Sequence, residues 1–94
     1  MNVAETFEKY SGEFLEFGRV QNPYSGRPDL HAFIMLDRLV AGQSDIISSA
    51  EHDEIYLDVS PQALEVVATE HHILTLVRCG VRYSQEFDCL CMFV

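Results

Sequence analysis

The stretch DEIYLDV (residues 53–59) alternates polar and branched apolar residues. A period of two predicts a β-strand with one face in the core and the other in solvent. The residues predicted to face the core are Ile55, Leu57 and Val59. The residues predicted to face outward are Glu54, Tyr56 and Asp58. The sequence therefore contains at least one half-exposed strand, and a strand requires a sheet.

Residues 81–94 predict a β-hairpin that completes this sheet. VRY (81–83) is its first strand and CLCMFV (89–94) its second, with a turn at 84–88. The second strand is apolar on both faces, so both faces must be covered. Helices can cover one face, whereas the other face needs more of the chain or a partner subunit.

Near the N-terminus, large apolar residues recur at spacings of three and four, which predicts an amphipathic helix. These residues are Val3, Phe7, Tyr10, Phe14 and Phe17. Gly12 lies inside the pattern and is expected to weaken or bend the helix. Residues 18–28 contain Asn-Pro, Ser-Gly and Arg-Pro pairs, which predict a loop.

A second helix is predicted from Pro28, since proline is favoured at the first helical position, to Ala41-Gly42. Its residues are apolar around most of the circumference, which indicates a central helix. The residues expected to reach solvent are His31, Asp37 and Arg38. A continuous apolar run also fits a buried strand, so a strand over residues 31–36 remains an alternative.

Further helix is predicted from Pro61, with Ser60 as its cap, to a stop at Gly80. Thr69 is a second candidate cap. The stretch 61–79 is therefore one helix or two, and we favour a split into 61–67 and 70–79.

Residues 43–53 are polar and predict a loop, from which Ile46 and Ile47 must dock onto the core. Together these patterns predict a single domain over residues 1–94 with an α+β fold. We expect a small three-stranded antiparallel or mixed sheet with two to four helices packed on one face.

Composition limits the classes of function. Fifteen acidic residues outnumber six basic ones, for a net charge of −9, and 48% of residues are hydrophobic. An acidic chain without a basic stripe disfavours direct binding to nucleic acid or to an anionic membrane. The three cysteines are predicted to be free thiols, the N-terminus lacks a signal-peptide pattern, and the apolar runs are too short to span a membrane. These features predict a cytoplasmic protein.

No motif for catalysis, metal or cofactor binding is present. The adjacent His71 and His72 would point about 100° apart on a helix and could not chelate one metal ion together. Cys89 and Cys91 lack the spacing of a zinc-binding pair. Cys79 precedes a helix end, where the helix dipole raises a thiol pKa. We therefore expect a non-enzymatic protein without a cofactor.

The predicted partner-binding surface is an acidic edge formed by Glu51, Asp53, Glu54 and Asp58, with Tyr56 between them. Carboxylates about 7 Å apart along a strand match the per-strand phosphate repeat of duplex DNA. This pattern suggests a small acidic inhibitor or accessory protein, of the kind that phages and mobile elements encode as DNA mimics. Its partner would be a nucleic-acid-handling protein with a basic groove. The simpler interpretation is a charged edge that deters aggregation.

Two other classes remain open. The protein could be a homo-oligomer joined through the doubly apolar C-terminal strand or through the aromatic first helix. It could also be a small cytosolic enzyme or metal-binding protein whose residues come together only in the fold.

Overall fold

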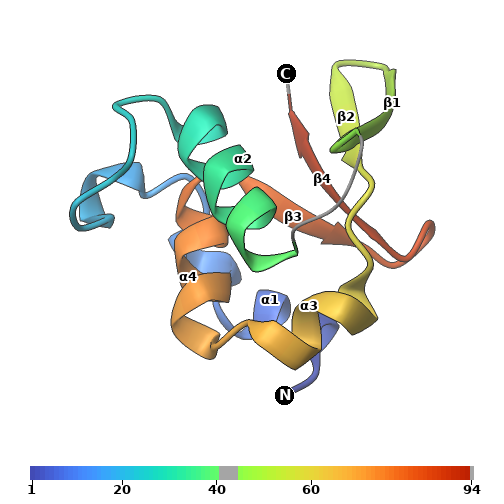
Figure 1. The fold of residues 1–94 in the computed structure, drawn as a ribbon, viewed down its shortest axis with the longest axis horizontal. Helices are drawn as coiled ribbons and strands as arrows, with labels where there is room; N and C mark the ends of the chain where they lie inside the picture. The colour runs from blue at the N-terminus through green and yellow to red at the C-terminus, as the bar shows by residue number, and fades with distance from the viewer. Residues whose placement is uncertain (41–44, 94) are drawn as a thin grey trace.

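Strand β4 (Cys89–Phe93) lies inside an antiparallel sheet in the computed structural model of the protein, which describes residues 1–40 and 45–93. It pairs with β3 (Val81–Ser84) on one side and with β2 (Glu54–Leu57) on the other. Strand β2 in turn pairs with β1 (Ile47–Glu51), which gives the order β1-β2-β4-β3 (Figure 1). The fold is α+β, as predicted, and the sheet has four strands in the described residues instead of three.

The additional strand, β1, falls in the stretch that was predicted to be a loop. Its sequence ISSAE has no alternating pattern, and all five of its residues are exposed. Backbone pairing with β2 therefore stabilises β1 as a strand, and the turn at His52 and Asp53 joins the two strands. Ile46 packs against the core as expected, whereas Ile47 is 43% exposed. Residues 41–44 lie outside the described residues. They include the predicted end of the second helix at Ala41-Gly42 and the first two residues of the predicted loop.

Helix α1 (Val3–Lys9) is shorter than predicted. After Tyr10 the chain forms two 3₁₀ turns, Ser11–Glu13 and Phe17–Arg19, instead of continuing as one helix to Phe17. Gly12 lies in the first of these turns, where its low helix propensity favours the break. Phe14, which follows the first turn, and Phe17, in the second, still pack against the core. The apolar pattern therefore predicted their packing correctly and their secondary structure incorrectly.

Helix α2 (Pro28–Leu39) settles the alternative for residues 31–36 in favour of a helix. Asp37 and Arg38 are exposed as predicted. The prediction that His31 reaches solvent is wrong, because only 3% of this residue is exposed. The Nδ1 atom of His31 accepts a hydrogen bond from the backbone N–H of Tyr24 at 3.0 Å, and the Tyr24 ring lies 4.9 Å from the imidazole between centroids.

Two helices, α3 (Pro61–Val67) and α4 (Glu70–Arg78), occupy the remaining helical stretch. Ser60 caps α3 by accepting a hydrogen bond from the N–H of Ala63. Thr69 begins α4 with a reciprocal capping arrangement, in which its hydroxyl accepts from His72 N–H and the His72 ring accepts from Thr69 N–H. Both caps satisfy helix N–H groups that would otherwise lack partners, and this explains the predicted split.

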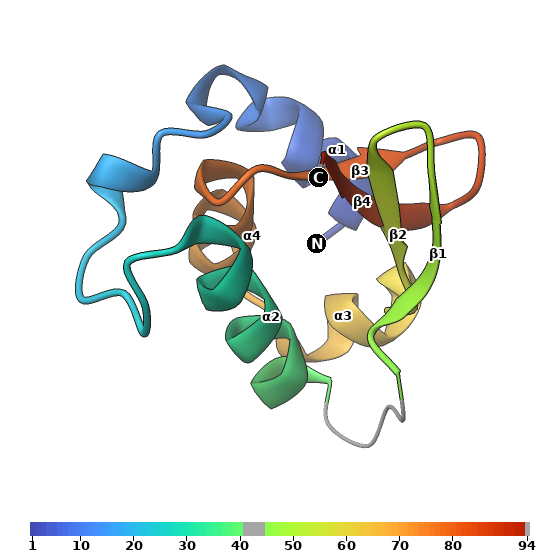
Figure 2. The ribbon, with the colours of Figure 1, turned by 90° about the horizontal axis from the view of Figure 1, so that it is seen from above.

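The four helices gather on one side of the sheet (Figure 2). The core lies between the helices and the sheet. Its fully buried aliphatic side chains come from both and include Leu36, Leu57, Leu64, Ile73, Leu76 and Leu90. Val59 is also buried, as predicted, although β2 ends before it. No helix of the described residues covers the other face of the sheet, and the candidate site lies on that face beside the start of α3.

Gly80 provides the first test of the fold. It follows α4 with a φ of +94°, and a Cβ at this position would lie 2.7 Å from Cδ2 of Leu15. We expect Gly80→Ala to destabilise the protein by about 1–2 kcal/mol, because a left-handed conformation penalises any side chain. Urea unfolding measures the change. Gly26→Ala is the control, since a Cβ there meets nothing within 4 Å. Equal effects of both substitutions would contradict the left-handed conformation of Gly80 and its close approach to Leu15.

The burial of His31 predicts a pH dependence of stability. Burial holds the pKa of His31 below its ordinary value of 6.5, so below about pH 6.5 the unfolded chain binds the proton more readily than the folded one. The stability contributed by His31 is therefore complete above this pH and falls as the pH decreases. Other titratable or basic residues around it are Arg19, Tyr24, His71, His72 and Arg78.

The measurement is urea unfolding of the wild type and His31→Asn between pH 7.5 and 5. The asparagine Oδ1 replaces Nδ1 as an acceptor, while the titrating ring is lost. The wild-type advantage should shrink as the pH falls, and parallel pH profiles of the two proteins would refute the prediction. Because the other histidines are present in both proteins, the difference isolates His31.

Candidate protein-binding groove on the outer face of the sheet

The outer face of β4 is covered in part by the chain itself. Cys91 points to this face and has Tyr56 of β2 and Arg82 of β3 as cross-strand neighbours. Only 2% of Cys91 is exposed. The Arg82 guanidinium lies 4.0 Å from the ring centroid of Phe93 and donates a hydrogen bond to Glu54. A partner subunit is therefore not needed to cover Cys91, although Phe93 itself is 58% exposed.

Glu54 is paired with Arg82 on the outer face of the sheet and therefore does not offer a free charge to a partner. Its carboxylate accepts hydrogen bonds from Arg82 and from the Tyr56 hydroxyl. The hydrogen bond from Arg82 holds the Glu54 pKa below its ordinary value. Because β2 and β3 both pair with β4, the fold brings residues 54 and 82 together across the sheet. This pairing removes one carboxylate from the acidic edge predicted from the sequence.

Asp53 occupies the tip of the β1–β2 turn. Its φ is +63° and that of His52 is +53°, so two residues in the left-handed region connect the strands, as in the tight hairpin turns that best match strand twist. Asp53 is exposed and is absent from the lining of the groove described next, so its role in partner binding stays a prediction.

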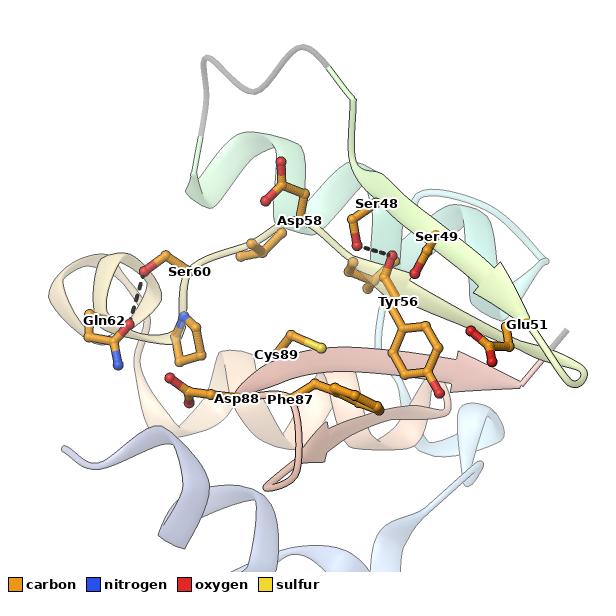
Figure 3. Close-up of a pocket in the computed structure, with 13 residues that line it drawn as sticks. Ser48, Ser49, Glu51, Tyr56, Asp58, Ser60, Gln62, Phe87, Asp88 and Cys89 are labelled. Carbon is orange, nitrogen blue, oxygen red and sulfur yellow. Dashed lines mark hydrogen bonds between the residues drawn. The ribbon is translucent and has the colours of Figure 1, made fainter.

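The other three predicted residues, Glu51, Tyr56 and Asp58, line one groove of about 460 Å³ on the outer face (Figure 3). Strands β1 and β2 form one wall. The opposite wall comes from the β3–β4 turn through Phe87 and Asp88. Sequence analysis missed these two residues because it treated the turn only as a connection, although an aromatic residue in the polar turn SQEFD was a signal for them.

The groove is suited to a cationic ligand. Its lining contains the carboxylates of Glu51, Asp58 and Asp88 and no lysine, arginine or histidine. The rings of Tyr56 and Phe87 meet edge to face, with centroids 5.4 Å apart and an interplanar angle of 77°. Carboxylates and aromatic rings are the groups that bind guanidinium and ammonium ions through charge-assisted hydrogen bonds and cation–π contacts.

Strand β1 adds an exposed backbone edge beside the groove. Among the strands of the described residues, it pairs only with β2. Ser48, Ser49 and Glu51 of β1 all line the groove, and Ser48 donates a side-chain hydrogen bond to the backbone carbonyl of Tyr56. An edge with unpaired N–H and C=O groups can accept an additional extended strand.

The cysteine thiols lack the properties of a nucleophile. All three are free. Burial raises the pKa of Cys79 to about 12, and it also raises the pKa values of Cys89 and Cys91. Thiols with raised pKa values carry little of the reactive thiolate at neutral pH. Among the described residues, no group of three or more His, Cys, Asp or Glu side chains is placed to hold a metal ion.

Comparison of the chain with protein-family models, with curated proteins and with solved structures gives no match. In the described part of the chain, no helix is both long enough and apolar enough to cross a membrane.

The turn that positions the groove wall provides a second test. We expect the double substitution His52→Asn and Asp53→Gly to stabilise the protein by about 1 kcal/mol, because asparagine and glycine adopt the left-handed conformation at lower cost. The unfolding free energy in urea measures this gain. Alanine at both positions is the control and should destabilise the hairpin. A stability order with the alanine variant above the Asn-Gly variant would show that the turn geometry is different.

Proposed function

We propose that this protein is a non-enzymatic binding module that holds a basic segment of another protein in the groove between the β1–β2 hairpin and the β3–β4 turn. The observation that carries the proposal is the composition of the groove. It combines three carboxylates with an aromatic pair and has no basic residue in its lining. A solvated acidic surface alone would not require an aromatic pair beside the carboxylates.

An arginine or lysine side chain fits this arrangement. Its charged end would lie against the rings of Tyr56 and Phe87 and within reach of the carboxylates of Glu51 or Asp58. Arginine is the better fit, because its planar guanidinium both stacks on aromatic rings and forms paired hydrogen bonds with carboxylates. The partner backbone would add to the exposed edge of β1, which would fix the direction of the bound segment.

The net charge of −9 supports a partner with a basic surface, because complementary charge increases association rates and suppresses unsuitable partners. Proteins that handle nucleic acids offer basic grooves of this kind. The negative charge therefore favours a specific version of this function, in which the protein is an inhibitor or accessory protein that occupies such a groove. The contact residues in this form are Glu51, Tyr56 and Asp58, together with Phe87 and Asp88, and not the complete acidic row.

Charge reversal in the groove tests the proposal. We expect the variant Glu51→Lys with Asp58→Lys to lose the partner that the tagged wild-type protein captures from its host's lysate. The partner should leave the wild-type protein at moderate salt, because exposed charges are screened beyond about 10 Å at 0.1 M. Mass spectrometry across a salt series measures both effects.

The control is Glu8→Lys with Glu16→Lys, which changes the net charge equally at exposed positions outside the groove. It should capture the same partner as the wild type. Loss of the partner by both variants would show that overall charge governs binding. Equal capture by the wild type and the groove variant would show that the groove is not the binding site.

Self-association is a second candidate, favoured by the exposure of apolar side chains on the same face. Phe87 is 59% exposed and Phe93 is 58% exposed. A second copy that covered β4 would bury both. A molecular mass of one chain by light scattering at high concentration would exclude this candidate, whereas a mass of two chains that reverts to one with Phe93→Ser would support it.

A further inference from the structure

A second cavity, of about 310 Å³, lies apart from the groove and shares no lining residue with it. It is bounded by α2, by α4 and by the loop that contains residues 19–24. Its lining includes Arg19, Arg78 and three of the four histidines of the chain, and it contains no carboxylate. In a chain with a net charge of −9, a cavity lined by basic side chains requires an explanation.

His31 is one of the residues that line this cavity, and its ring carries a buried donor. Its Nδ1 accepts the hydrogen bond from Tyr24 N–H, so the proton of the neutral ring must be on Nε2. The Nε2 atom is buried and has no hydrogen-bond partner among residues 1–40 and 45–93. Buried polar groups are nearly always paired, so the Nε2–H group indicates an acceptor that the protein chain does not supply.

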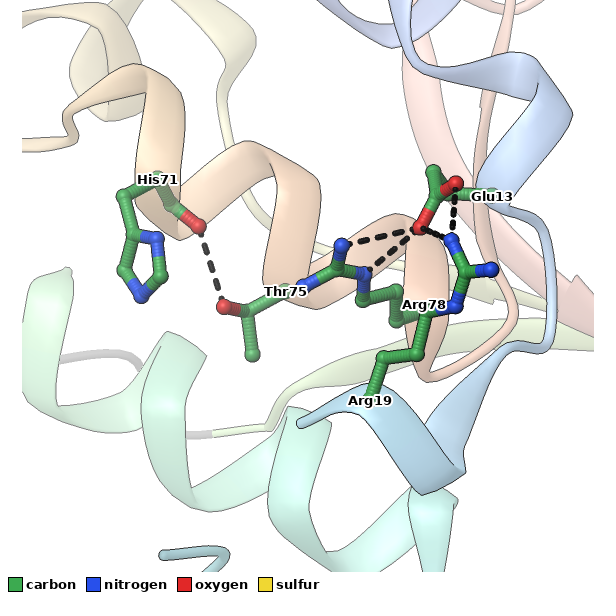
Figure 4. Close-up of polar contacts among 5 residues, drawn as sticks. All are labelled: Glu13, Arg19, His71, Thr75 and Arg78. Atoms are coloured by element: carbon green, nitrogen blue, oxygen red, sulfur yellow. Dashed lines mark hydrogen bonds and ion pairs between the residues drawn. The ribbon is translucent and has the colours of Figure 1, made fainter. Parts of the chain in front are cut away.

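The two arginines share one carboxylate (Figure 4). Glu13 Oε1 accepts hydrogen bonds from Nε of Arg78 at 3.0 Å and from NH1 of Arg19 at 3.1 Å, and Glu13 Oε2 lies 2.8 Å from the same Arg19 nitrogen. The Arg78 side chain is only 18% exposed. Two guanidinium groups against one carboxylate leave an excess of one positive charge beside the cavity that both arginines line. Solvent reaches this charge, because the Arg19 side chain is 61% exposed.

We propose that this cavity binds a small oxyanion, a carboxylate or a phosphate, that accepts a hydrogen bond from Nε2 of His31 and pairs with the guanidinium of Arg19. A water molecule would satisfy the Nε2–H group but would not form an ion pair with Arg19, whose charge is otherwise only hydrated. An oxyanion would do both. The cavity volume is at the lower end of the range of small-molecule sites, roughly 300–1,000 Å³, which fits a ligand of a few heavy atoms.

The proposal is independent of the proposed partner-binding function. The cavity and the acidic groove share no lining residue. Failure of one proposal therefore leaves the other intact, and a variant of one site serves as a control for the other.

The experiment titrates the full chain with sodium phosphate and, in a separate arm, with sodium acetate. Sodium chloride holds the ionic strength constant. Imidazole resonances in NMR spectra report binding at His31, and thermal unfolding reports the gain in stability. We expect a saturable shift of the His31 resonances in at least one arm, and the arm with the higher affinity identifies the oxyanion.

The matched variants are Arg19→Gln and Arg27→Gln, which remove the same charge. Arg27 pairs with Asp29 and is absent from the cavity lining. Arg19→Gln should weaken binding about tenfold, as expected for loss of a charge-assisted hydrogen bond, and Arg27→Gln should bind like the wild type. The general stabilisation that phosphate gives to proteins does not saturate and affects both variants alike.

Absence of a saturable His31 shift in both arms would overturn the proposal. Equal affinities of Arg19→Gln and Arg27→Gln would overturn it as well, because the excess positive charge would then have no part in binding. His31→Asn, which keeps an acceptor for Tyr24 N–H, should abolish the ligand-dependent gain in thermal stability. If this variant does not fold, the pair of arginine variants decides the question.

Discussion

The structure depends on covering both faces of β4. A strand with the sequence CLCMF is apolar on both faces, so both faces need cover, although Phe93 at its end stays 58% exposed. The helices cover Leu90 and Met92 on one face. On the other face, Arg82, Phe93 and the neighbouring strands cover Cys91. This requirement places β4 between β2 and β3, and the same placement brings the β1–β2 hairpin opposite the β3–β4 turn, where the groove forms.

The sequence predicted those helices and strands that are determined by residues close together in the chain. Alternation predicted β2, and the caps Ser60 and Thr69 predicted the division of residues 61–79 into two helices. Strand β1 could not be predicted, because Ser-Ser-Ala has no alternation and the strand exists only through its pairing with the open edge of β2. The burial of His31 was also unpredictable, since it depends on Tyr24, a loop residue whose position no periodic pattern fixes.

The candidate site shows the same division. Composition predicted that Glu51, Tyr56 and Asp58 would be exposed to a partner, and the structure places them in one groove. The sequence contains no information on register, so the pairing of Glu54 with Arg82, 28 positions away, was missed. Phe87 and Asp88 were missed for a different reason, since residues 84–88 were interpreted only as a turn. The fold also separates charge, with carboxylates in the groove and basic side chains around the helical cavity.

The proposed function requires that the groove, and not the acidic surface as a whole, recognises a basic segment. The most direct measurement is an NMR titration of the isotopically labelled protein with a short arginine-rich peptide at low and at moderate salt. The account predicts shifts that saturate and are confined to the lining of the groove, notably Ser49, Glu51, Tyr56 and Phe87. Shifts spread in proportion to local negative charge, including those of Glu5, Glu8 and Glu16, would contradict it.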